Sequence, residues 1–186
     1  MGLSNSWIAV RGLDRAAALE ALQLELGREI PRDELPDLAV GEAPGGWLVL
    51  TISGDAIFGA RFLDLAKGRT AVACFEEEHV MYAEARGYED GVETWRVIHN
   101  PDEDERHLEV SGTPPPALAE LRAKAAREDD EGDGTDFFFE IPPELARSVC
   151  GYRFANDGSP EVVFTEILRP RPAAKPGLLA RLFGAR

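Results

Sequence analysis

The chain has 186 residues, of which 44% are hydrophobic and 29% are charged. This composition is typical of a folded globular protein and excludes a wholly disordered chain. The formal net charge is −14, but residues 169–186 hold five basic side chains and no acid. Residues 1–168 therefore carry 15 basic against 34 acidic side chains, a balance of −19. A surface this negative repels phosphate backbones, so we expect no direct binding to nucleic acid.

The first third of the chain predicts a strand, a helix and a connection. Residues 7–12 alternate and are rich in β-formers, which predicts a strand. Asp14 can cap a helix over 15–26, where three leucines share one face and Gly27 would end it. Residues 28–45 contain three prolines and scattered acids, and they predict a connection. The next expected elements are a buried strand within 45–54 and a short helix over 61–67.

The middle of the chain contains four β-like runs in succession. They occupy residues 70–77, 79–88, 92–100 and 106–112, and short acidic turns join them. Such spacing predicts an antiparallel meander. Side chains alternate along a strand, so Trp95, Val97 and His99 are expected on one face.

The remaining elements complete an α+β prediction. Prolines open a helix over 115–127, which a Glu120–Lys124 pair would support, and a second helix over 143–150. "FFFEI" at 137–141 predicts a strand, and 151–168 a hairpin turning at 156–158. We therefore expect a single domain over residues 1–168, with a central antiparallel β-meander and flanking helices.

The three histidines and two nearby glutamates form a possible metal centre. His79, His99 and His107 all lie in the predicted meander, and a turn near Glu77 would bring Glu77 or Glu78 beside His79. A metal-dependent enzyme built on these five residues is therefore one alternative. No HExxH or paired CxxC spacing supports it, so we expect no metal and no cofactor. Residues 129–140 partly match a calcium loop, but Pro142 and Pro143 interrupt the required exit helix.

The two cysteines, Cys74 and Cys150, are predicted to be reduced, buried thiols. The first residues do not show the basic region followed by an apolar stretch that is typical of a signal peptide. No apolar run is long enough to span a bilayer. We therefore expect a cytoplasmic protein.

The basic segment, residues 169–186, begins with a proline-rich spacer and continues as "GLLARLFGAR". In a helix, its large apolar side chains would share one side while Arg181 stays outside; they are Leu178, Leu179, Leu182 and Phe183. Such a segment needs something to bind. The candidates are an anionic membrane surface, a groove on another protein, or the acidic body of this same protein.

Three stretches carry a resemblance: "EEHVMYAEARGYEDGVETWRVIH", "HLEVSGTPPPALAEL" and "FFFEIPPELARSVCGYR". Together they resemble a family of small acidic uncharacterised bacterial proteins over residues 7–152. The resemblance implies a bacterial cytosolic protein and transfers no catalytic residue.

The favoured function is binding rather than catalysis. The acidic surplus favours encounter with a protein that has a basic surface, so we expect a non-enzymatic interaction domain, such as an inhibitor or immunity-type partner. The expected contact residues are exposed acids near the sheet and two aromatic anchors: Glu76, Glu77, Glu78, Glu89, Asp90, Tyr82 and Trp95. Docking through the basic segment is the third alternative.

Overall fold

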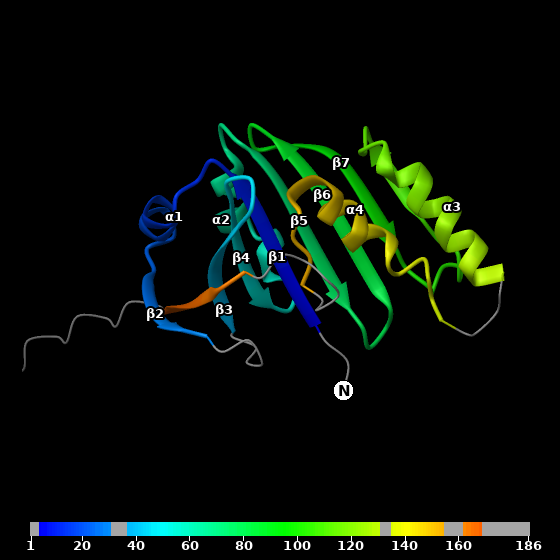
Figure 1. Ribbon diagram of the computed structural model, residues 1–186, viewed down its shortest axis with the longest axis horizontal. Coiled ribbons are helices and arrows are strands. Elements are labelled where there is room, and N and C mark those ends of the chain that lie inside the picture. The colour runs from blue at the N-terminus through cyan, green and yellow to red at the C-terminus, as the bar shows by residue number, and fades with distance from the viewer. Residues whose placement is uncertain (1–3, 31–36, 131–134, 155–161, 169–186) are drawn as a thin grey trace, which may run out of the picture.

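A computed structural model describes residues 4–30, 37–130, 135–154 and 162–168. Nine strands form one sheet: β1 (Ser4–Arg11), β2 (Glu25–Glu29), β3 (Leu38–Ala43), β4 (Trp47–Ser53), β5 (Thr70–Glu77), β6 (Tyr82–Glu89), β7 (Val92–His99), β8 (Glu109–Gly112) and β9 (Phe164–Leu168). Their order across the sheet is β2-β9-β3-β4-β1-β5-β6-β7-β8, and every neighbouring pair is antiparallel (Figure 1).

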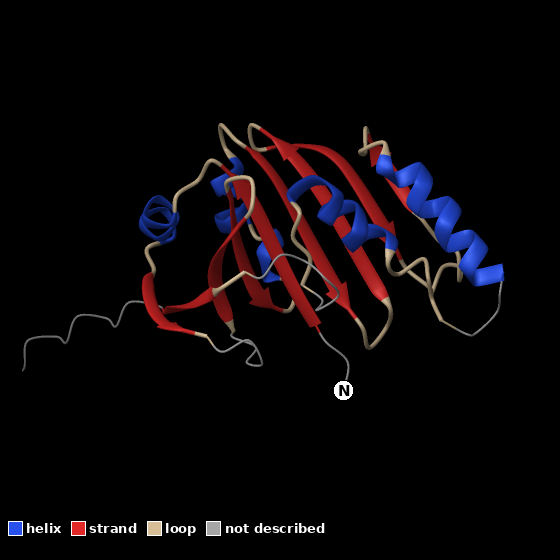
Figure 2. Ribbon diagram, in the orientation of Figure 1, coloured by secondary structure: helices blue, strands red, loops and turns tan. Residues whose placement is uncertain are grey.

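Helices cover both faces of this sheet. They are α1 (Arg15–Leu22), η1 (Ala56–Phe58), α2 (Ala60–Leu63), η2 (Asp64–Ala66), α3 (Ala117–Asp130) and α4 (Ile141–Cys150), where η marks a 3-10 helix. Figure 2 shows α3 and α4 on the near side of the sheet. α4 packs on β5, β6 and β7, and α3 packs on α4. The expected α+β class is confirmed.

The central strand β1 explains why two cores form. Its side chains at Ile8 and Val10 join the core beneath α1 and the short helices of residues 56–66. Trp7 and Ala9 point to the other face and join the core beneath α4. All four side chains are fully buried. A strand buried on both faces requires apolar residues in succession, as "WIAV" provides.

The predicted meander is present as β5-β6-β7-β8. Trp95, Val97 and His99 share one face as expected, and the structure shows that this face is buried on the α4 side. Trp95 depends on a glycine in the neighbouring strand. A Cβ atom at Gly87 would lie only 1.9 Å from Nε1 of Trp95. The absence of a side chain at Gly87 therefore makes room for the indole.

The prediction for residues 15–45 was wrong in two respects. The helix α1 stops at Leu22 because Gln23 takes a left-handed conformation (φ 53°) and its N–H bonds to the carbonyls of Leu19 and Glu20. Residues 28–45 were predicted to be a connection, yet they include the end of β2 and all of β3. Both strands pair with β9, which lies more than 120 residues further along the chain.

The strand predicted at 137–141 is also absent. The Asp136 carboxylate accepts hydrogen bonds from the backbone N–H groups of Phe138 and Phe139, both at 3.1 Å, and α4 begins at Ile141. Among the described residues of the hairpin predicted at 151–168, one strand is present, β9, which pairs with β2 and β3. Its turn at 156–158 lies outside the described residues.

The other predicted elements are present with shifted ends. The strand expected within 45–54 is β4, and the helix expected over 61–67 is split into α2 and η2. The helices expected over 115–127 and 143–150 are α3 and α4. No described helix combines the length and apolarity needed to cross a membrane. The basic segment lies outside the described residues.

Candidate functional site

The face of the meander opposite α4 carries a row of aromatic, aliphatic and charged side chains. Cross-strand pairing places them on one side, and we call them the open face: Phe75, Tyr82, Glu84, Arg86, Arg96 and Ile98. Among the described helices, none packs extensively on β7 or β8 from this side. The open face is turned away from the reader in Figure 2, because α3 and α4 lie on the near side.

A buried carboxylate organises the centre of the open face. Glu84 is only 4% exposed. It accepts a hydrogen bond from Arg86 Nε at 2.6 Å and another from the Tyr82 hydroxyl at 3.2 Å. The Arg86 guanidinium also lies 4.1 Å from the ring centre of Phe58 in η1. These contacts hold a cation and a phenol in fixed positions on an otherwise helix-free surface.

The pKa shifts follow from this arrangement. Burial, reinforced by the negative charge of Glu84, raises the pKa of Tyr82 to about 12. Burial by itself would lower the pKa of Arg86, but the hydrogen bond and charge of Glu84 outweigh it, so the pKa of Arg86 is raised. Both groups therefore keep their neutral-pH protonation states, and neither is prepared to act as a general base.

The outer part of the open face is suited to contact with another protein. The rings of Phe75 and Tyr82 lie 5.9 Å apart at 49°. Arg96 is half-exposed and pairs with Glu93 at 3.6 Å, and Ile98 lies beside it on β7. Tyrosine, arginine and other large side chains held rigidly on a strand are the types that dominate binding energy at protein interfaces.

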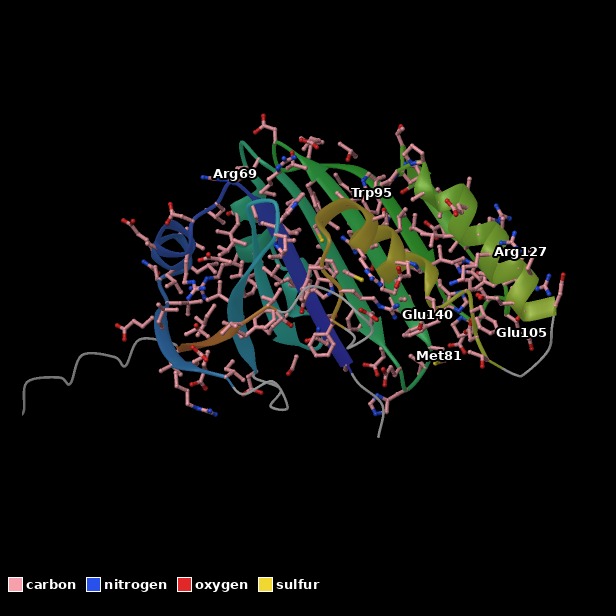
Figure 3. All side chains as sticks on the ribbon, in the orientation of Figure 1. Arg69, Met81, Trp95, Glu105, Arg127 and Glu140 are labelled. Atoms are coloured by element: carbon pink, nitrogen blue, oxygen red, sulfur yellow. The ribbon has the colours of Figure 1, made fainter. Side chains whose placement is uncertain are left out.

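Six carboxylates line one end of the meander, next to the open face. His99 at the end of β7 pairs with Ala83 at the start of β6, so the β5–β6 turn and the loop after β7 lie at the same end. We call these carboxylates the acidic rim: Glu77, Glu78, Asp102, Glu103, Asp104 and Glu105. Figure 3 shows Met81 from the turn and Glu105 from the loop at this end.

The charges of the acidic rim are only partly balanced. The pKa of Glu77 is lowered most by a hydrogen bond from Ser4. The hydrogen bond with His79, 2.5 Å long, has the next largest effect. The Arg106 guanidinium pairs with Asp129 and Asp130 of α3, and only the backbone N–H of Arg106 bonds to a loop carboxylate, that of Asp104. The rim therefore presents a strongly negative border beside the open face.

The expected contact residues do not form one patch. Glu77 and Glu78 lie in the acidic rim, and Tyr82 lies on the open face. Glu89 and Asp90 lie at the opposite end of β6, about 23 Å away along the strand. There Glu89 accepts a hydrogen bond from Thr70, and Asp90 accepts one from the Gly68 N–H.

The expectation that the contact acids are exposed was wrong for Glu76, and Trp95, expected as an aromatic anchor, is also buried. Trp95 is 7% exposed and Glu76 is 6% exposed, and both point toward the α4 side. Glu76 lies 3.8 Å from the guanidinium of Arg153, which also binds Glu140 at 2.5 Å and Glu144 at 2.7 Å. This buried cluster ties the chain after α4 to the start of that helix and to β5, a structural role.

Two of the three histidines lie together, and the third is separate. His79 is exposed and bound to Glu77, as the turn predicted. His99 is fully buried, with Nδ1 2.8 Å from the His107 carbonyl and Nε2 3.0 Å from the Asp136 carboxylate. His107 Nδ1 accepts a hydrogen bond from the Asn100 N–H. The described residues include no group of three His, Cys, Asp or Glu side chains placed to hold a metal ion.

The cysteines are buried and free, as expected. Burial raises the pKa of Cys74 well above its usual value and that of Cys150 to about 11. Raised values disfavour the thiolate, so neither group is activated as a nucleophile. Part of the calcium-like stretch lies outside the described residues, but its first and last acids are engaged elsewhere, Asp129 with Arg106 and Glu140 with Arg153.

Sequence reasoning missed the residues that organise this surface. Glu84 and Arg86 have the alternate spacing that signals one face of a strand, and "PDEDE" is an evident acidic loop. Nothing in the sequence indicated that Phe58 covers Arg86. No protein-family model, curated protein or solved structure matches the chain.

Proposed function

We propose that this chain is a non-enzymatic interaction domain that binds a protein with a basic surface through the open face and the acidic rim. The observation that carries the proposal is the open face itself. Large, rigidly held side chains lie on a sheet face where the described helices leave room, and six carboxylates border them. An inhibitor or immunity-type partner would use such a surface to cover a basic site on its target.

The open face and the acidic rim have different roles in this proposal. Tyr82, Arg96 and Ile98 are partly exposed and supply contact area that a partner removes from water. The acidic rim attracts a cationic partner over a longer range and speeds the encounter. Binding should therefore weaken with salt mainly through slower association.

The test is retention of partner proteins on the immobilised full chain at roughly 0.1 M and 1 M salt, between which the screening length falls from about 10 Å to about 3 Å. The chain carrying Glu103→Lys and Glu105→Lys should lose the salt-sensitive partner. The control carries Glu20→Lys and Glu25→Lys, which make the same charge change at exposed positions on α1 and β2.

A second variant probes the contact area. Arg96→Ala should weaken binding by roughly tenfold or more, because it removes a half-exposed arginine, which pairs with Glu93 on the same strand, from the open face. Equal retention by the wild type, the rim variant and Arg96→Ala would overturn the proposal.

A further inference from the structure

A groove lies between α3 and α4, on the side of the sheet opposite the open face. It has a volume of about 400 Å³, within the range of sites that hold a ligand or an inserted side chain. Ala117, Glu120, Leu121 and Lys124 line it from α3. From α4 and the residue after it come Glu144, Arg147, Ser148 and Gly151.

The lining suits an occupant that is mainly apolar and carries a cation at the edge where Glu120 lies; the other acid, Glu144, already binds Arg147 and Arg153. Ala117 and Leu121 provide an apolar wall and pack against the core beneath α4. Glu120 lies exposed at the edge, and no ion pair to it is found within the described ranges. The sequence predicted a Glu120–Lys124 pair, but Lys124 instead lies 3.8 Å from Glu128. The groove also adjoins the C-terminal end of α4, where the helix dipole favours a positive charge.

We propose that the basic segment of this same chain binds in the α3–α4 groove. Its sequence supplies what the lining requires, with Leu178, Leu182 and Phe183 for the apolar wall and Arg181 for Glu120. A stretch of about ten residues forms a marginal helix alone, and a groove that buries its apolar side stabilises it. The opposite charges of residues 1–168 and 169–186 favour the same pairing.

The reach of the spacer is comparable with the distance across the sheet to α4. β9 ends at Leu168, and five strand spacings separate β9 from β6, or about 24 Å. The nine residues 169–177 can span about 30 Å when extended. Because the segment is tethered, its effective concentration at the groove is on the order of millimolar. With an intrinsic Kd near 0.1 mM, the docked form of the segment would then outnumber the undocked form by roughly tenfold.

The test compares NMR spectra of the full chain with those of the full chain carrying Leu182→Asp and Phe183→Asp. Backbone resonances of Ala117, Leu121, Ser148 and Gly151 should shift between the two. A control with Ala173→Asp and Ala174→Asp adds the same charges within the spacer and should leave these resonances in place. A synthetic peptide of residues 175–186, added to the Leu182/Phe183 variant, should restore them with a Kd near 0.1 mM.

Glu120→Lys should weaken the peptide's binding by roughly tenfold, whereas Glu20→Lys on α1, another exposed helical carboxylate, should not. Unchanged groove resonances in the Leu182/Phe183 variant would overturn the proposal. So would shifts that depend on protein concentration, which indicate docking between copies, or shifts produced only by vesicles of anionic phosphatidylglycerol. The result is independent of partner binding at the open face, because the groove lies on the opposite side of the sheet.

Discussion

Replacing Arg153 by methionine should destabilise the protein by about 3 kcal/mol, because removing one partner of a buried ion pair costs about 3–5 kcal/mol. The side chain of Arg153 is 6% exposed, and the substitution leaves the Glu76 carboxylate, 8% exposed, without this cation. The lower end of the range applies because water reaches Glu140 and Glu144, which are 43% and 27% exposed. Glu144 also keeps its contact with Arg147.

Urea unfolding measures the change as a lower midpoint at an unchanged slope. Arg106 provides a matched control, since it binds two carboxylates at 2.5 and 2.6 Å but is 46% exposed. Arg106→Met should leave the midpoint nearly unchanged. Adding Glu76→Gln to Arg153→Met should recover a large part of the loss. Two results would refute the reasoning that burial makes the Arg153 ion pairs stabilising. One is an equal fall in urea midpoint for the two arginine variants, and the other is no rise in midpoint when Glu76→Gln is added.

Three further outcomes are expected. Gly87→Ala should destabilise the protein by about 1–3 kcal/mol in urea unfolding, since its Cβ would overlap the indole of Trp95, and Trp95→Leu in the same chain should make the effect less than additive. Tyr82 should ionise near pH 12 in an absorbance titration; because its pKa is raised from 10, the stability it contributes is complete below pH 10 and is lost as pH rises through 12, and Tyr82→Phe should flatten that decline. Cys74 and Cys150 should react with a thiol reagent at neutral pH only as fast as the protein opens, and immediate reaction of either would contradict the burial described.

The sequence was sufficient for elements whose signal is local. The alternation of Trp95, Val97 and His99 predicted correctly that they share one face of β7, but not that this face is buried. It was insufficient where a distant partner decides the conformation, as for β2 and β3, which are held by β9. Short apolar runs do not by themselves distinguish a strand from part of a helix. In "FFFEI" the ambiguity is resolved by hydrogen bonds from the backbone to Asp136, which the alternation of the phenylalanines does not reveal.

The candidate site was predictable only in part, for a related reason. Alternation assigns residues to two faces of a strand, but it does not say which face a helix will cover. Glu76 and Glu84 follow similar polar patterns, yet Glu76 is enclosed on the α4 side by Arg153, which lies 77 positions later. Glu84 is enclosed on the other side by its own neighbours Tyr82 and Arg86. Exposure is therefore a property of the assembled layers rather than of the local sequence.

The insertion of β9 between β2 and β3 sets the order in which the sheet can be completed. Within the described sheet, β9 is the only neighbour of β2, and it also covers the outer edge of β3. While the ribosome is still synthesising residues 162–168, β3 offers unsatisfied amide and carbonyl groups to any other extended chain. The nascent protein therefore passes through a period of vulnerability to aggregation that lasts until this late strand emerges, and slowed translation beyond β8 would lengthen it.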